Sequence, residues 1–327
     1  MALSSRFVES HIPTWTARLA SSDRAYRKQW PSRLFHHSPL ENALVILRDG
    51  YLRSRNDPYC ARVRDVAAPG VISNAVDAHD RVRLYFRPRT PTQFHIEGIR
   101  KNEECQYGSN SHAPMLVMFV LDAKSVFSLG EVMFSDRNMQ RNDKLTGSDE
   151  EFFLTIPFDK VYHDSGIGGD ISIISHRCAE VLPNTPLVLS SCLKEICFRS
   201  EPERDTLLHQ LGSERIVWEK YCRVSEELKV FDKRYAFVSE LRLSADGVTF
   251  RINGRHDSKP VDLKIEGWDD LGVKRIEFHN SNIGTINESS GRWIFRTPLG
   301  PSNYFIRIHL EGQLACECHI SLLQSLI

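Results

Sequence analysis

The chain has 327 residues, of which 41% are hydrophobic and 26% charged, and its 42 basic side chains balance its 42 acidic ones. This length allows one large domain or two ordinary ones around a sizeable core. The sequence lacks the run of about 18 apolar residues that a membrane span needs and the basic-then-apolar N-terminus of a secretory signal, so we expect a soluble, cytoplasmic protein.

The cysteines are scattered and form no Cys-x-x-Cys pair. They lie at positions 60, 105, 178, 192, 197, 222, 316 and 318. A structural zinc site usually draws on closely spaced pairs of ligands. We therefore expect reduced thiols with structural roles and no metal.

Charge is distributed unevenly along the chain. Residues 1–100 hold 16 basic and 9 acidic side chains, whereas residues 101–230 hold 14 and 21. Arginine dominates the basic part, at positions 53, 55, 62, 64, 81, 83, 87, 89 and 100. Guanidinium groups bind phosphate through two parallel hydrogen bonds, so this cluster suits a pyrophosphate or a nucleic-acid backbone. A solvated basic face is the alternative.

The first hundred residues predict two helices, a loop and a strand. Residues 1–30 carry apolar side chains at helical spacing, and so do residues 40–52, where Gly50 is placed to end the helix. Residues 53–80 are polar and predict a long loop, which is often a functional feature in a compact domain. Val82–Phe86 predicts a strand.

The middle of the chain alternates short strands with one clear helix. Strand-like runs lie at Pro114–Leu121, Glu131–Ser135, Ile171–Ile174 and Leu193–Arg199. The continuous apolar run at Pro114–Leu121 is typical of a buried strand. The strand expected at Ile171–Ile174 leads into residues 177–182, which would place Glu180 on or at the end of a strand. A helix is expected at Pro202–Leu211, with acidic side chains in its first turn.

Beyond about residue 235 the pattern changes to short alternating strands. They are expected at Val248–Ile252, Val261–Ile265, Arg275–Phe278, Arg292–Phe295, Tyr304–Ile308 and Ala315–Ile320. Gly, Asn, Asp or Pro separates them, which favours a small antiparallel sheet or sandwich. We therefore predict one domain at 1–230 and a second at 235–327.

Three short motifs point to an enzyme that consumes NAD. They are His36-His37-Ser38, Leu84–Gln93 and His176–Leu182. Together they supply a histidine, an arginine-rich aromatic segment and a carboxylate. Loss of nicotinamide builds positive charge on the ribose, as glycoside cleavage does, and a nearby carboxylate stabilises that charge or deprotonates the acceptor. Glu180 is the candidate for this role.

Structural roles are open for the same residues. Glu180 would also fit an edge strand as a partner of Arg177. His36 would fit a core position or a cap for the helix that follows. Tyr85 and Phe86 would fit the core side of a strand.

In the order of these motifs, the sequence resembles the DarT family of bacterial ADP-ribosyltransferase toxins, which modify bases in nucleic acid. The resemblance spans about residues 33–210 and includes His36-x-Ser38. Three further runs are Leu84–Gln93, Met133–Asp136 and Arg177–Leu182, similar to the family's aromatic-Phe-x-x-Arg-Ser/Thr-Pro, Phe-Ser/Thr-Asp-Gly and Arg-x-Ala-Glu-hydrophobic runs. Where the family often has Gly-His after Ser/Thr-Asp, this chain has Arg137-Asn138.

The resemblance implies an α+β fold, in which an ADP-ribosyltransferase-like split β-sheet core with helices is followed by a small all-β domain. Residues 1–230 would form the NAD-binding catalytic domain and residues 235–327 an accessory domain for partner or substrate recognition. Glu180 would be the catalytic glutamate. The family also has a catalytic arginine before the aromatic strand, and Arg62 and Arg64 both fit that position.

The resemblance likewise implies a cofactor pocket. His36 and Ser38 would bind the nicotinamide side of NAD, and Tyr85, Phe86 and Arg89 would help to build the same pocket. NAD would serve as substrate, with no metal.

The function implied is a mono-ADP-ribosyltransferase toxin that modifies a base in single-stranded DNA or RNA, within a bacterial toxin–antitoxin or anti-phage defence system. Its partners would be the nucleic acid and an antitoxin protein, with or without a chaperone. Two alternatives stay open. One is an NAD glycohydrolase that uses the same pocket, and the other is a non-catalytic module that binds a partner.

Overall fold

The computed structural model describes residues 3–66, 78–105, 108, 111–285 and 292–322. The chain divides into two compact units. Unit 1 comprises Met1–Ile96, Val117–Cys197 and Ser225–Phe231, and unit 2 comprises Glu97–Leu116, Phe198–Val224 and Asp232–Ile327. The segments of the two units therefore alternate along the sequence. The division into domains at 1–230 and 235–327 stays a prediction.

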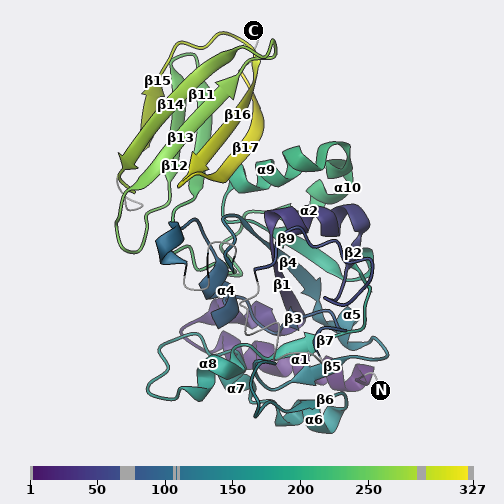
Figure 1. The fold of residues 1–327 in the computed structure, drawn as a ribbon. Coiled ribbons are helices and arrows are strands. Elements are labelled where there is room, and N and C mark those ends of the chain that lie inside the picture. The colour runs from purple at the N-terminus through teal and green to yellow at the C-terminus, as the bar shows by residue number, and fades with distance from the viewer. Residues whose placement is uncertain (1–2, 67–77, 106–107, 109–110, 286–291, 323–327) are drawn as a thin grey trace. The chain divides into compact units, whose positions relative to one another are not determined.

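A mixed set of short strands forms the sheet of unit 1 (Figure 1). The strands are β1 (Arg33–Pro39), β3 (Leu84–Tyr85), β4 (Leu116–Asp122), β5 (Met133–Ser135), β6 (Thr146–Gly147), β7 (Glu180–Leu182) and β9 (Leu193–Cys197). Within this unit they follow the order β9-β4-β1-β3-β7-β5-β6. The β3 strand pairs antiparallel with β1 on one side and with β7 on the other. A separate pair joins β2 (Tyr51–Leu52) to β8 (Leu187–Val188).

Helices surround this sheet. They are α1 (Ser5–Ala20), η1 (Ala25–Ser32), α2 (Leu40–Asp49), α4 (Pro91–Ile96), α5 (Ala123–Phe127), α6 (Glu150–Thr155), α7 (Phe158–Val161) and α8 (Ser172–His176). The Ser4 side chain accepts the Phe7 N–H and so caps α1. Gly50 follows α2 with φ 78°, the left-handed conformation that ends a helix and favours glycine.

Unit 2 contains β-sheets and a helix that packs against one of them. Its helical elements are η3 (Asn102–Glu104), α9 (Glu201–Leu211), η6 (Gly212–Glu214), α10 (Arg215–Trp218) and η7 (Glu219–Tyr221). Its strands are β10 (Cys222–Arg223), β11 (Val238–Ser244), β12 (Gly247–Ile252), β13 (Val261–Trp268), β14 (Lys274–Ile283), β15 (Trp293–Arg296), β16 (Asn303–Leu310) and β17 (Gln313–Ser321). The β11–β17 strands form two antiparallel sheets, β11-β12-β15 and β14-β13-β16-β17. In Figure 1, α9 lies beside β17, and the Glu317 N–H donates to the Thr206 hydroxyl at 2.8 Å.

The fold class expected from the sequence is confirmed: an α+β core is followed by antiparallel sheets. Strand β4, strand β9, helix α2 and helix α9 lie where they were predicted. Strands β1 and β11 were not predicted. Part of the loop predicted at 53–80 lies outside the described residues.

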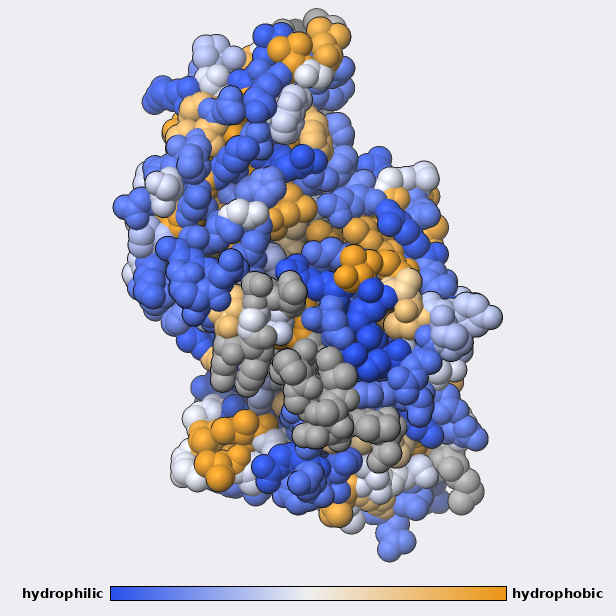
Figure 2. Space-filling model, in the orientation of Figure 1, coloured by the Kyte–Doolittle hydropathy of each residue, from blue (hydrophilic) through white to orange (hydrophobic). Residues whose placement is uncertain are grey.

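The strand predicted at Ile171–Ile174 is wrong, because these residues belong to α8 and the turn before it. The Asp170 side chain accepts the Ser172 N–H at 3.0 Å and starts that turn. Ile173 and His176 are buried at helical spacing, while Ile171 and Ile174 are exposed. Figure 2 shows apolar atoms over α8 at the surface. A short apolar run fits a helix turn as well as a strand, so spacing alone could not separate the two.

In the described part of the chain, no helix is both long and apolar enough to cross a membrane.

Candidate active site

Glu180 begins strand β7, as the sequence predicted, and lies opposite Tyr85 of β3. Tyr85 in turn lies opposite Phe35 of β1, the residue before His36. The pairing of β1, β3 and β7 therefore brings the first motif close to the last one. The Glu180 N–H donates to the Ser135 hydroxyl at 3.0 Å. Ser135 belongs to the Met133–Asp136 run, and this contact shows what that run does: it fixes the backbone that carries the carboxylate.

Arg83 binds the Glu180 carboxylate with two hydrogen bonds. Its Nε donates to Oε2 at 2.7 Å and its Nη2 donates to Oε1 at 2.5 Å. Burial disfavours the charge of Arg83, but the Glu180 carboxylate outweighs burial and raises the pKa of the guanidinium. The Glu180 side chain is fully buried, whereas 26% of the Arg83 side chain is exposed. This bidentate pair fixes the orientation of the carboxylate.

A carboxylate has about four lone-pair sites, and the two bonds from Arg83 use two of them. The remaining sites can accept a ribose hydroxyl or a proton from an acceptor. Glu180 is therefore placed to stabilise positive charge on a ribose or to act as a general base.

Two histidines of β1 lie next to this pair. His36 Nδ1 lies 3.0 Å from the Arg83 carbonyl oxygen, to which it donates in the tautomer that is protonated there. The His37 ring stacks on the Tyr85 ring with centroids 5.3 Å apart and planes 5° apart. Burial lowers the pKa of both imidazoles, to about 3 for His37. Both rings are therefore neutral at pH 7, and Ser38 beside them is buried.

The two arginines predicted to be catalytic have partners other than Glu180 in the described structure. Arg64 binds Glu41 at 3.1 Å, and the Asn42 side chain holds its backbone through both its N–H and its carbonyl. Arg62 lies 3.8 Å from Asp65. Neither is among the hydrogen-bond or ion-pair partners of Glu180 in the described residues, and their catalytic role stays a prediction.

Two of the residues predicted to bind cofactor have structural partners. Phe86 is buried against the rings of Phe127, Phe134, Phe153 and Phe158. Arg89 binds the Asp164 carboxylate together with Arg87, whose own contact is 2.5 Å. A contact between either residue and NAD stays a prediction.

Sequence reasoning missed Arg83 and His37. Arg83 was one of many arginines in a basic segment, and nothing marked it apart. The signal was available, because side chains two residues apart on a strand share a face. In the strand predicted at Val82–Phe86, Arg83 and Tyr85 would lie on one face.

Within the described residues, no three His, Cys, Asp or Glu side chains are grouped so that they could hold a metal ion.

Comparisons with known proteins give the family and the fold. Residues 35–229 match the family model described as "ssDNA thymidine ADP-ribosyltransferase, DarT". Among functionally curated proteins, none matches the chain. The fold of DarT from Thermus sp. 2.9 in complex with ADP-ribosylated ssDNA is similar, with a TM-score of 0.51 and 17% identity over 61% of this chain and 96% of that one.

Two further solved structures are similar at lower scores. The Thermus sp. 2.9 DarT complex with carba-NAD+ has a TM-score of 0.48 and 18% identity, covering 61% of this chain and 97% of that one. Thermosipho africanus DarTG in complex with ADP-ribose has a TM-score of 0.41 and 13% identity, covering 66% of this chain and 54% of that one.

The family match, which covers more than half of the chain, and the carboxylate site define the class of protein: an NAD-dependent ADP-ribosyltransferase. The chain belongs to the DarT family of single-stranded DNA thymidine ADP-ribosyltransferases.

Proposed function

We propose that this protein transfers the ADP-ribosyl group of NAD to a thymidine base of single-stranded DNA and that Glu180 is its catalytic carboxylate. The observation that carries this proposal is the ion pair between Glu180 and Arg83. Glu180 lies opposite Tyr85 in the sheet, and all three residues lie within the segment that matches the family.

The reaction breaks the bond between nicotinamide and the ribose carbon C1′, and nicotinamide leaves with the electron pair. Positive charge then develops on the ribose, where the Glu180 carboxylate stabilises it. A nitrogen of the base forms the new bond to C1′ and loses its proton, which Glu180 accepts. Arg83 acts as a positioning residue, because it orients the carboxylate through two bonds.

The neighbouring residues of β1 and β3 would hold the cofactor. His36 and Ser38 would bind the nicotinamide side of NAD, and Tyr85 would line the pocket. Neutral imidazoles add no positive charge next to the cation that forms on the ribose, which suits the chemistry. One of Arg62 and Arg64 would contact the pyrophosphate or the acceptor.

A single strand is the expected substrate, because a base inside a duplex must be unpaired and unstacked at a cost of a few kcal/mol. As one solved structure with a similar fold is named DarTG, the proposal extends to a cytoplasmic toxin controlled by an antitoxin protein. Unit 2 would then supply recognition of the partner or of the strand.

The test incubates the protein with NAD labelled on its ADP-ribose part and with separate pools of single-stranded DNA, duplex DNA, RNA and protein. We expect label on single-stranded DNA that contains thymidine, and none on a matched strand in which every thymidine is replaced. Label on RNA alone would contradict the proposal. Free ADP-ribose as the only product would identify a glycohydrolase instead.

A further inference from the structure

A cysteine, a histidine and a glutamine of unit 2 form a chain of hydrogen bonds. The Cys105 Sγ lies 3.3 Å from His112 Nδ1, and His112 Nε2 lies 2.8 Å from the side-chain oxygen of Gln313, the first residue of β17. Cys105 and His112 are seven positions apart, whereas Gln313 follows His112 by 201 positions. None of the three residues has a role in the proposed chemistry.

The orientation of Gln313 fixes the tautomer of His112. The Gln313 Nε2 donates to the Arg100 carbonyl oxygen at 2.6 Å, so Oε1 of the same amide faces the imidazole. This oxygen can only accept, and His112 Nε2 therefore carries a proton and donates it. In the neutral ring Nδ1 is then the acceptor, placed to take the proton of Cys105. The Lys101 carbonyl oxygen, at 3.4 Å, is a second acceptor for the thiol.

Transfer of this proton produces a thiolate beside an imidazolium. Both N–H groups of the imidazolium then have acceptors, which are the Cys105 thiolate and the Gln313 oxygen. An ordinary cysteine is only a few per cent thiolate at pH 7, and an adjacent base or cation raises that fraction. Because the thiolate is the nucleophilic form of cysteine, the arrangement favours a reactive thiol.

The charged groups around Cys105 also favour the thiolate. Burial lowers the pKa of Arg100, while the charges of Tyr235 and then of Cys105 act in the opposite direction, so the guanidinium and the thiolate attract each other. The Arg100 guanidinium lies 4.1 Å from the Tyr235 ring centroid. The acidic neighbour in the sequence, Glu104, is bound by Arg255 at 2.6 Å, which compensates its negative charge.

Cys105 is accessible as well, unlike most thiols of this chain. Six of the eight cysteines are buried, and only Cys60 and Cys105 are partly exposed. His112 is 3% exposed, so the base is held inside while a reagent reaches the sulfur from solvent. Oxidation of cysteine follows thiolate character and exposure. A hydroperoxide, which is small and needs no shaped cavity, therefore fits this site.

We propose that Cys105 is a modification site, at which His112 holds a thiolate that reacts with hydrogen peroxide. The Cys105 sulfur gives its proton to His112 Nδ1 and attacks one peroxide oxygen. As the S–O bond forms and the O–O bond breaks, the sulfur loses two electrons to the peroxide. The leaving hydroxide takes the proton from Nδ1 and departs as water. The product is a sulfenic acid on Cys105.

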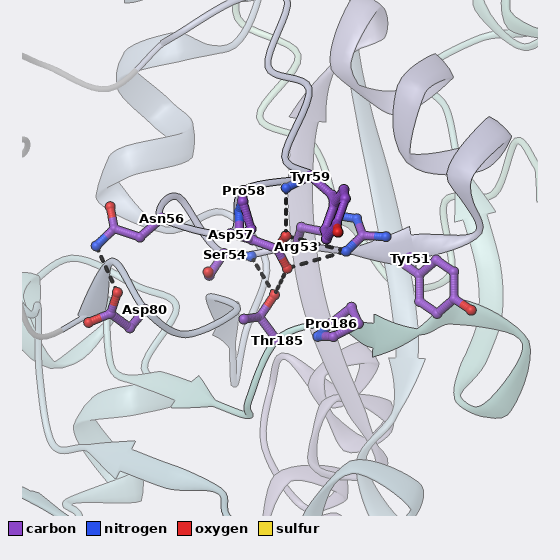
Figure 3. Close-up of a pocket in the computed structure, with 10 residues that line it drawn as sticks. All are labelled: Tyr51, Arg53, Ser54, Asn56, Asp57, Pro58, Tyr59, Asp80, Thr185 and Pro186. Carbon is purple, nitrogen blue, oxygen red and sulfur yellow. Dashed lines mark hydrogen bonds and ion pairs between the residues drawn. The ribbon is translucent and has the colours of Figure 1, made fainter.

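Cys60 of unit 1 is a matched control within the same chain. It is partly exposed, and its Sγ lies 3.9 Å from Arg62 Nη2. Its N–H donates to the carbonyl of Asp57, one of the residues that line a pocket of about 570 Å³ (Figure 3). Both thiols thus interact with a guanidinium, but of the two only Cys105 has an imidazole partner among the described residues. A difference in reactivity between them measures the effect of His112.

The first experiment follows alkylation of the folded, full-length wild type by iodoacetamide, with each cysteine quantified by peptide mass spectrometry. At pH 7 we expect Cys105 to react about threefold or more faster than Cys60, since the larger thiolate fraction outweighs the lower nucleophilicity of a weaker base. This ratio should be larger at pH 6 than at pH 8, because an ordinary thiol loses about tenfold in rate per pH unit below its pKa. A ratio that is independent of pH would reflect exposure alone and would overturn the inference.

The second experiment replaces the base. His112→Asn keeps a polar side chain that takes up no proton, so the alkylation rate of Cys105 should fall to that of Cys60. His309→Asn is the control, because His309 is a half-buried histidine on β16 of the same unit, and Cys105 should keep its rate there. A His112→Asn protein with the melting temperature and the Cys105 reactivity of the wild type would contradict the proposal. If this variant melts lower, the pH dependence in the wild type decides.

The third experiment tests the reaction itself. The wild type is treated with hydrogen peroxide in the presence of dimedone, which traps sulfenic acids, and the adduct on each cysteine is quantified. We expect about threefold or more adduct on Cys105 than on Cys60. Fast alkylation without a sulfenic adduct on Cys105 would overturn the reaction with hydrogen peroxide. These measurements use neither NAD nor DNA, so their outcome is independent of the proposed function.

Discussion

Arginines of residues 83–89 in unit 1 form ion pairs with two carboxylates, Glu180 and Asp164. The two carboxylates differ in how many side chains bind them. At Asp164, Arg87, Arg89 and the Tyr26 hydroxyl all contact one carboxylate. At Glu180, Arg83 is the one guanidinium partner among the described residues. The Arg87 side chain is 1% exposed, whereas that of Arg83 is 26% exposed.

Under the proposed function, this difference would separate a structural centre from a reactive one. A carboxylate surrounded by two cations and a hydroxyl has little capacity left for a substrate. The Glu180 carboxylate, bound by one partly exposed arginine, keeps acceptor sites for a further hydrogen bond. Under the proposed function, arginines a few positions apart would serve the scaffold in one place and the chemistry in the other.

The largest effect expected is on catalysis at Glu180. Glu180→Gln keeps the shape of the side chain but removes its charge, so the rate of transfer should fall by about a hundredfold or more. The melting temperature and the affinity for NAD should stay close to wild type. Single-turnover transfer, a thermal melt and calorimetry measure the three quantities. Near-normal turnover would remove Glu180 from the mechanism.

The second effect is on stability at Asp164. Burial disfavours the Asp164 carboxylate, but Arg87 and Arg89 outweigh burial and lower its pKa. Asp164→Asn leaves buried Arg87 without its counter-charge, so the free energy of unfolding should fall by about 3–5 kcal/mol. Urea titration measures it, with Glu180→Gln as the comparison. A stable Asp164→Asn protein that has lost transfer would instead place Asp164 in the active site.

The third comparison sets Arg83 against the two arginines of the preceding loop. Arg83→Gln removes two charge-assisted hydrogen bonds and should reduce transfer about tenfold or more, since each such bond contributes about 1.5–3 kcal/mol. Of Arg62→Ala and Arg64→Ala, one should cost far more transfer than the other. Equal and small losses in both loop variants would show that the catalytic arginine is neither of them.

The last effect expected is a change in how stability depends on pH. Burial lowers the pKa of His37 from 6.5 to about 3. Between these values the unfolded chain binds the proton and the folded one does not, so this contribution is complete above about pH 6.5 and is lost as pH falls. His37→Asn should reduce the slope of unfolding free energy against pH by about 1.4 kcal/mol per pH unit in that window. Urea titrations at several pH values measure the slope, and an unchanged slope would contradict the prediction.

The strand position of Glu180 could be predicted because its motif is local. Glu180 lies within a run of six residues whose strand character is readable, and its position on β7 is as expected. Arg83 was harder, because its role depends on the pairing of β3 with β7, which joins residues about a hundred positions apart. Single-sequence patterns carry no direct signal of such pairing.

Strand β1 was missed for a related reason. Its buried and half-buried residues do not alternate, and the sequence Arg33–Pro39 contains two histidines and a terminal proline. This segment is a strand because it lies between β4 and β3 in the sheet. Tertiary context therefore overrides a weak local preference.

The interleaving of the two units has a consequence for synthesis on the ribosome. Trp30 donates to the Leu228 carbonyl and Gln93 to that of Val230, so unit 1 is completed only when residues 225–231 have emerged. Helix α9 must wait longer for its contact with β17, the last strand described. About a hundred residues separate α9 from β17. At about 5–20 residues per second, they take about 5–20 s to translate. Unit 1 can thus fold while α9 still lacks its contact with β17, and this interval is when a nascent-chain-binding factor would meet the protein.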